Sequence, residues 1–154
     1  MFFTRLQNDW HRALRTYLGI TALAHLAWET LQLPLYSIWS TGTSREVVFA
    51  VAHCTVGDLM ISALSLIAAL LFFGRESWPG ERFSPVALAT LFFGIGYTIY
   101  SEWSNTVVLK TWAYSELMPR LPLLGTGLSP LMQWLIVPIL GFAAIRCLNG
   151  RVDK

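Results

Sequence analysis

Four long apolar stretches constrain the fold of this chain more than any other feature of its sequence. They cover residues 18–39, 47–73, 86–109 and 128–148, and each holds the roughly 20 predominantly apolar residues that a helix needs to cross a bilayer. Hydrophobic residues make up 55% of the chain and charged residues 13%, a balance that excludes an ordinary soluble domain. Because the connections are short, the sequence predicts an all-α integral membrane protein, a four-transmembrane-helix bundle over residues 18–148.

The basic residues predict an orientation. With four spans, both termini and the middle loop share one side of the membrane, and this side carries eight of the eleven Lys and Arg residues. Cytoplasmic loops are enriched in Lys and Arg, so we expect cytoplasmic termini, in a bacterial inner membrane. The net charge of +2 follows from this topology, and we predict no nucleic-acid partner. The eight residues are Arg5, Arg12, Arg15, Arg75, Arg82, Arg146, Arg151 and Lys154; the other three are Arg45, Lys110 and Arg120.

The two terminal segments carry different expectations. Residues 1–17 have an aromatic and aliphatic face opposite Arg12 and Arg15, a pattern typical of an amphipathic helix in the cytoplasmic interface. A helical extension of the first span explains the same pattern equally well. We expect residues 149–154 to form a short cytoplasmic tail.

A polar stripe runs through the first apolar stretch, in the sequence HLAWETLQLPLY. His25, Glu29, Gln32 and Tyr36 fall on one face of a helix with 3.6 residues per turn. Side chains of this kind avoid lipid, because an ionised carboxylate in hydrocarbon costs about 2.5–3.5 kcal/mol on insertion scales. The stripe is therefore expected to face other helices.

The other three stretches place polar groups at a similar depth, between the midplane and the surface opposite the termini. Asp58 and Glu29 each need a partner, water or a proton, and we expect His53 to pair with Asp58 and His25 with Glu29. Gly57 is expected to let a neighbouring helix approach closely. Together the stripes predict a polar cavity in the outer half of the bundle, lined by Gln32, Tyr36, His53, Tyr97, Ser101, Glu102, Gln133 and Trp134.

Short motifs in all four stretches resemble the EXPERA-domain family, which includes the emopamil-binding proteins (sterol isomerases) and the sigma-2 receptor. The family's His-x-x-x-Glu pair resembles His25 and Glu29 in HLAWE, and its acidic residue in the next helix resembles Asp58 in GDLMIS. A Gly and a Tyr of its third helix are similar to GIGYTIY. The Trp and Pro of its last helix resemble Trp134 and Pro138 in QWLIVP.

The resemblance implies a function for the predicted cavity. It implies binding of a lipophilic small molecule and acid–base isomerisation of a sterol- or isoprenoid-like lipid, with His25, Glu29 and Asp58 as catalytic residues and no cofactor. The eight polar and aromatic residues listed for the cavity would then contact the ligand. The chain departs from the family at Leu131, where the family has a catalytic Asn, and at Asp58, where the isomerases have Glu.

Two other hypotheses fit the same residues. His25, Glu29, His53 and Asp58 supply nitrogen and oxygen ligands that suit Zn²⁺, Fe²⁺ or Mn²⁺, so a metal site within the membrane is one alternative. A small accessory subunit of a larger membrane complex is another, with the polar stripes acting as interhelical contacts. The sequence also leaves open a homodimer, and it leaves open whether the loop after Lys110 covers the cavity as a lid or only anchors the chain at the interface.

Overall fold

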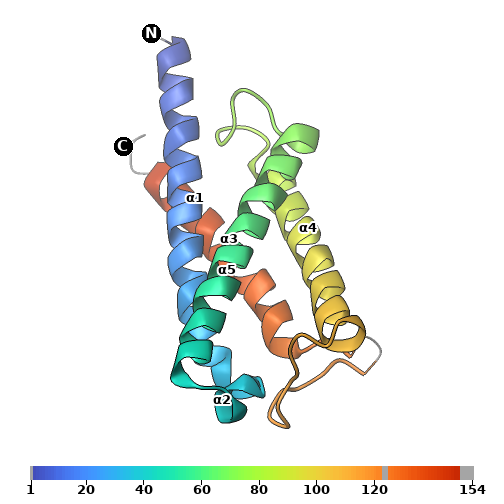
Figure 1. Ribbon diagram of the computed structural model, residues 1–154. Coiled ribbons are helices and arrows are strands. Elements are labelled where there is room, and N and C mark those ends of the chain that lie inside the picture. The colour runs from blue at the N-terminus through green and yellow to red at the C-terminus, as the bar shows by residue number, and fades with distance from the viewer. Residues whose placement is uncertain (1, 123–124, 150–154) are drawn as a thin grey trace.

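The computed structural model describes residues 2–122 and 125–149 and is all-helical over that part. Four long helices are joined by short helical turns and loops (Figure 1). The long helices are α1 Phe2–Gln32, α3 Ser44–Phe73, α4 Phe83–Trp103 and α5 Leu128–Asn149. The short elements are the 3-10 helix η1 Leu33–Leu35, the helix α2 Ile38–Thr41 and the π-helical turn η2 Ser104–Val108.

The four long helices run antiparallel in chain order. The start of α1, the end of α5 and the loop 74–82 lie at one end of the molecule, and α2 and residues 109–122 and 125–127 of the loop after η2 lie at the other (Figure 1). Each long helix packs mainly against two others: α1 and α4 both contact α3 and α5. The four long helices therefore form a ring in which each contacts two neighbours.

Helix α1 is continuous from Phe2 to Gln32. Residues 2–17 therefore extend the same helix. The predicted separate interfacial helix over residues 1–17 is not formed, and the alternative, an extension of the first apolar stretch, fits the structure. The helix also ends earlier than the predicted stretch 18–39, because Pro34 has no N–H to donate and disfavours the α-helical conformation of Leu33 before it. A short 3-10 turn and α2 follow instead. Of the predicted tail 149–154, residues 150–154 lie outside the described residues.

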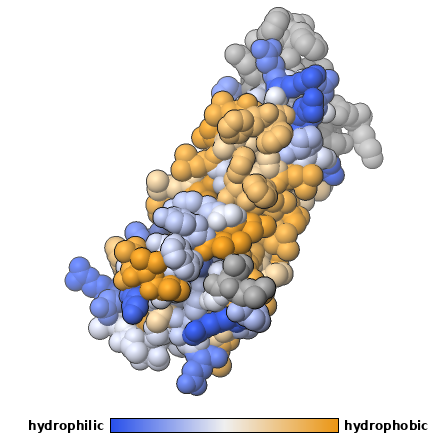
Figure 2. All heavy atoms as spheres, turned by 90° about the vertical axis from the view of Figure 1, so that its right-hand side faces the viewer, coloured by the Kyte–Doolittle hydropathy of each residue, from blue (hydrophilic) through white to orange (hydrophobic). Residues whose placement is uncertain are grey.

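Within the described residues, three helices are long and apolar enough to cross a membrane: Ser44–Phe73, Phe83–Val108 and Leu128–Leu148. They match three of the four predicted stretches within three residues at each end. Helix α1 is also long enough, at 31 residues, but the polar stripe of His25, Glu29 and Gln32 lowers its hydropathy. Hydrophobic residues dominate the middle of the face that Figure 2 shows, between more hydrophilic ends.

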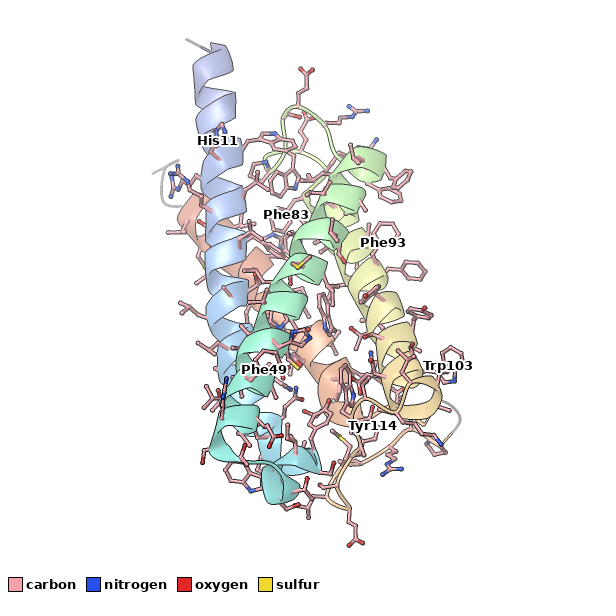
Figure 3. All side chains as sticks on the ribbon, viewed as in Figure 1. His11, Phe49, Phe83, Phe93, Trp103 and Tyr114 are labelled. Atoms are coloured by element: carbon pink, nitrogen blue, oxygen red, sulfur yellow. The ribbon has the colours of Figure 1, made fainter. Side chains whose placement is uncertain are left out.

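The half of the bundle next to the termini, called the termini half below, contains a tightly packed apolar core. Its buried residues are Ala13, Tyr17, Leu66, Ala69, Trp78, Val86, Phe142 and Ile145. Gly141 permits the approach of α5 to α1, because a Cβ at this position would lie 2.8 Å from Tyr17 Cδ2. Phe83, labelled in Figure 3, packs edge-on against Phe142 in this half.

Candidate functional site

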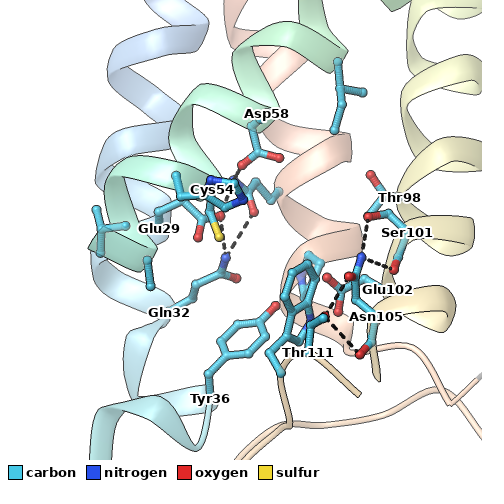
Figure 4. Close-up of a pocket in the computed structure, with 18 of the residues that line it drawn as sticks. Glu29, Gln32, Tyr36, Cys54, Asp58, Thr98, Ser101, Glu102, Asn105 and Thr111 are labelled. Atoms are coloured by element: carbon cyan, nitrogen blue, oxygen red, sulfur yellow. Dashed lines mark hydrogen bonds between the residues drawn. The ribbon is translucent and has the colours of Figure 1, made fainter. Parts of the chain in front are cut away.

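The other half of the bundle, called the pocket half, contains a pocket of about 1540 Å³. Its walls come from the end of α1, from α3, α4 and α5, and from residues 111–113 of the long loop. Figure 4 shows Glu29 and Asp58 on one side of this pocket and Glu102 on the other, with Tyr36 between them. Polar groups from separate helices therefore surround one space.

The side-chain amide of Gln133 on α5 connects the polar groups of one wall. Its Nε2 lies 2.8 Å from Asp58 Oδ2, 3.0 Å from Glu29 Oε1 and 2.9 Å from His25 Nδ1. An amide nitrogen carries two hydrogens, so it can donate to only two of these three acceptors at once. The third acceptor has to be satisfied by a different proton.

His25 is fully buried behind this wall and does not line the pocket. Because Gln133 Nε2 is only a donor, Nδ1 of His25 accepts, and the proton of the neutral imidazole sits on Nε2. That nitrogen lies 3.0 Å from Ser62 Oγ, which can accept it. On the Nδ1 side, Asp58 Oδ2 is 3.5 Å away, so a second proton on the ring would create an ion pair with Asp58.

A second chain of hydrogen bonds fixes Glu29 from the side of α1. Gln32 Nε2 donates to Glu29 Oε1 at 2.6 Å, and Ser129 Oγ donates to Gln32 Oε1 at 2.8 Å. The indole of Trp28 in turn donates to Ser129 Oγ at 3.1 Å. Glu29, Gln32 and Gln133 are all buried, which leaves these carboxyl and amide groups little freedom to change position.

Trp134 packs beside this cluster, with its ring 5.3 Å from the His25 ring. It fits because Gly94 on α4 has no side chain, since a Cβ there would lie 2.3 Å from Trp134 Cε3. The close approach predicted for Gly57 is wrong, because a Cβ on Gly57 would meet nothing within 4 Å. Gly57 lines the open pocket instead.

Glu102 forms a separate polar contact at the opposite wall. It is buried and accepts a hydrogen bond from the Tyr114 hydroxyl of the long loop, which itself accepts from the Gly127 N–H at 2.9 Å. The loop is also tied to the segment after α1: Ser37 N–H donates to the Ala113 carbonyl, and Ser115 N–H donates to the Leu35 carbonyl, both at 2.9 Å. The loop is therefore held in place where its residues 111–113 line the pocket.

The structure brings most of the predicted site residues together around this pocket. Ten of the eleven line it, and only His25 lies behind its wall: the ten are Glu29, Gln32, Tyr36, His53, Asp58, Tyr97, Ser101, Glu102, Gln133 and Trp134. Sequence reasoning missed Tyr114, which belongs to a loop without periodicity, and it missed the role of Ser62 as a partner of His25.

The predicted His–carboxylate pairs differ from the observed contacts. His53 is exposed and stacks on Phe49 at 5.6 Å, so its expected pairing with Asp58 is wrong. Asp58 meets Gln133 and His25 instead. His25 and Glu29 are joined through the Gln133 amide.

The alternative metal site does not form within the described part of the chain. No group of three or more His, Cys, Asp and Glu side chains is placed there to hold an ion. The four expected ligands were His25, Glu29, His53 and Asp58. Three of them contact the Gln133 side chain, whereas the exposed ring of His53 stacks on Phe49 instead. This geometry does not support the metal interpretation.

Comparisons with known proteins return no matching family model, no matching curated protein and no matching solved structure. The likeness to the EXPERA-domain family therefore stays a prediction that depends on the short motifs of the sequence.

Proposed function

We propose that the protein is a four-span membrane bundle with cytoplasmic termini, and that α1 is the fourth span. The observation that favours this is the division of α1 into two faces. Its polar residues His25, Glu29 and Gln32 are buried against other helices, whereas Leu23 and Leu31 are 69% and 80% exposed. An apolar exposed face suits lipid contact, because ionisable groups in spanning helices face the bundle interior.

We further propose that the pocket binds a lipophilic small molecule and that Glu29 and Asp58 exchange protons with it. The observation that carries this proposal is the convergence of these two carboxyl groups, from α1 and α3, on one amide nitrogen of α5 at the wall of a large pocket. Two neighbouring carboxyl groups in a site of low dielectric do not both ionise. One of them then holds a proton and the other is a base.

This pair can catalyse the shift of a carbon–carbon double bond. The Glu29 O–H transfers its proton to one alkene carbon, and the π electrons form the new C–H bond and leave a carbocation. The rings of Trp134 and Tyr97, both lining the pocket, stabilise that cation by cation–π attraction. Asp58 then removes a proton from the neighbouring carbon, whose C–H electrons form the new double bond. The overall reaction is redox-neutral.

His25 acts in this scheme as a positioning residue. It lies behind the wall of the pocket, so it does not touch the ligand. Its Nδ1 faces Asp58 Oδ2 at 3.5 Å. A proton gained by Asp58 can be passed to this nitrogen, and the resulting imidazolium is stabilised by its ion pair with the Asp58 carboxylate. Ser62 holds the other ring nitrogen in place.

The experiment combines lipid analysis with isotope exchange. The protein is purified gently, its co-purified lipids are identified by mass spectrometry, and the same preparation is incubated in D₂O. Reversible protonation of an alkene carbon incorporates deuterium from water into the lipid, so we expect incorporation with the wild type. With Glu29→Gln we expect the lipid to be retained and the incorporation to fall at least about 100-fold, since general acid–base groups contribute roughly 10²–10⁴.

Glu81→Gln provides the matched control, because Glu81 is an exposed carboxylate of the 74–82 loop at the opposite end of the molecule. It should behave as the wild type in both assays. Retained exchange in Glu29→Gln would exclude Glu29 as the acid. A wild-type preparation that carries no stoichiometric lipophilic molecule would contradict the proposed function itself.

A further inference from the structure

The pocket is open along one side of the bundle as well as at its end. Four of its lining residues are large and apolar or aromatic and are also exposed: Phe49, Met60 and Leu64 on α3 are 60–68% exposed, and Tyr97 on α4 is 49% exposed. Figure 1 shows α3 and α4 diverging toward the end that carries α2. The gap that these four residues border is called the side opening below.

The end of the pocket has a different character. Apart from Ala113, the exposed lining residues there are polar. They come from the end of α2, the start of α3 and the long loop: Thr41, Thr43, Arg45, Glu46 and Thr111. The pocket therefore has a polar rim at the end of the bundle and an apolar border along its side. This polarity matches the change from headgroup to hydrocarbon that a membrane-spanning bundle meets along its axis.

We infer that the ligand is a bilayer lipid with a hydrocarbon chain, which enters the pocket sideways through the side opening. This inference rests on the proposed function and names the source and the chemical class of the ligand. Both helices that border the opening are apolar enough to span a membrane, so the opening faces hydrocarbon. A solute from water would have to cross that hydrocarbon to reach the side opening, whereas a lipid already resides there.

The charges of the pocket limit which part of the lipid can reach its deep wall. The buried ionisable residues that line the pocket, Glu29 and Glu102, and the largely buried Asp58 are all acidic. The only Lys or Arg among its lining residues is the exposed Arg45 at the polar rim. An anionic headgroup would be repelled by the acidic wall, so the part of the ligand that reaches the wall carries no negative charge, and the chain extends through the side opening.

Gly57 offers a way to close the side opening without disturbing a helix contact. It lines the pocket on α3, and an added Cβ would meet nothing within 4 Å. Gly96 on α4 is equally open, is exposed and does not line the pocket. A tryptophan at Gly57 would project into the pocket, and a tryptophan at Gly96 would not, so the two substitutions form a matched pair.

The experiment uses phosphatidylcholine vesicles that contain a diacylglycerol with a diazirine close to the glycerol end of one acyl chain, the end that the proposal places at the deep wall. After reconstitution and irradiation, cross-links are mapped by peptide mass spectrometry. We expect labelling of Gln133 and Trp134, which are 2% and 1% exposed and are reached only from within the pocket. Gly57→Trp should reduce this labelling at least tenfold, and Gly96→Trp should leave it unchanged.

Labelling of Ile139 and Leu140 gives an internal reference on the same helix, because these residues are 47% and 49% exposed and contact surrounding lipid in every variant. Equal labelling of Trp134 in the wild type and in Gly57→Trp, with this reference unchanged, would overturn the side entrance. If lipid still co-purifies in that case, the proposed function stands and only the route fails. If the wild type shows neither co-purified lipid nor labelling of Trp134, the proposed function fails as well.

Discussion

The two halves of this bundle are built from the same four helices and differ in what lies between them. In the termini half, buried aromatic and aliphatic side chains such as Tyr17, Phe142 and Trp78 fill the space. In the pocket half, the buried side chains are largely polar, and the helices enclose a pocket of about 1540 Å³. Phe83 and Tyr114 mark the two halves in Figure 3.

The difference indicates how such a bundle can hold a polar cluster. Dispersion contacts in a dense core stabilise helix packing without requiring polar partners. Side chains such as Glu29 and Gln133 gain less from packing and depend on every hydrogen bond being made. One half of each helix can therefore supply the packing that holds the bundle together, and the other half can keep a space open between the same helices.

Replacement of Tyr17 tests the termini half and should have the largest effect on stability. Tyr17→Ala removes a fully buried ring whose centroid lies 4.9 Å from that of Phe142. We expect the free energy of unfolding to fall by about 3–5 kcal/mol, measured by thermal unfolding in detergent. Tyr17→Phe is the control. The hydroxyl of Tyr17 has no hydrogen-bond partner among the described residues, so its removal should leave stability unchanged or raise it by up to about 1 kcal/mol. A large loss in Tyr17→Phe would contradict this view of the core.

Replacement of Gly94 sharpens the comparison in the pocket half. Gly94→Ala places a methyl group 2.3 Å from the Trp134 ring, and overpacking of this kind typically costs about 1–3 kcal/mol. Gly96→Ala, two residues along α4, meets nothing within 4 Å and should stabilise the helix by up to about 1 kcal/mol. Thermal unfolding gives the sign for both variants. A loss of retained lipid in Gly94→Ala alone would connect the position of Trp134 to binding, whereas equal behaviour of the two variants would show that Trp134 moves aside freely.

The sequence predicts the fold well because its strongest signal is local. Long apolar stretches predict the three candidate spans, and Pro34 explains where α1 ends and the chain turns. Residues 2–17 were ambiguous, because an interfacial helix and an extension of a span share the same amphipathic pattern.

The candidate site is only partly predictable, since its contacts join helices that are distant in the chain. Helical spacing shows that His25 and Glu29 share a face, but it does not show that Gln133 from α5 lies between them. Spacing also cannot separate a glycine that meets an indole, Gly94, from one that borders open space, Gly57. The predicted pairing of His53 with Asp58 was wrong for the same reason. Residues five apart on one helix do not face each other, so their contact would have depended on the packing of another helix.

The smallest expected effect comes from the contact that holds the long loop over the pocket half. Burial raises the pKa of the Tyr114 hydroxyl above its ordinary value, so the phenol stays protonated at neutral pH and can donate to Glu102. Tyr114→Phe removes this donor and also the acceptor of the Gly127 N–H, while the ring can still pack against Tyr36. We expect a loss of about 1 kcal/mol, seen as roughly fivefold faster amide hydrogen exchange of the Gly127 N–H, with amides of the termini half unchanged. Tyr100→Phe is the control, because Tyr100 is 59% exposed on α4; equal exchange in both variants would show that packing alone holds the loop in place.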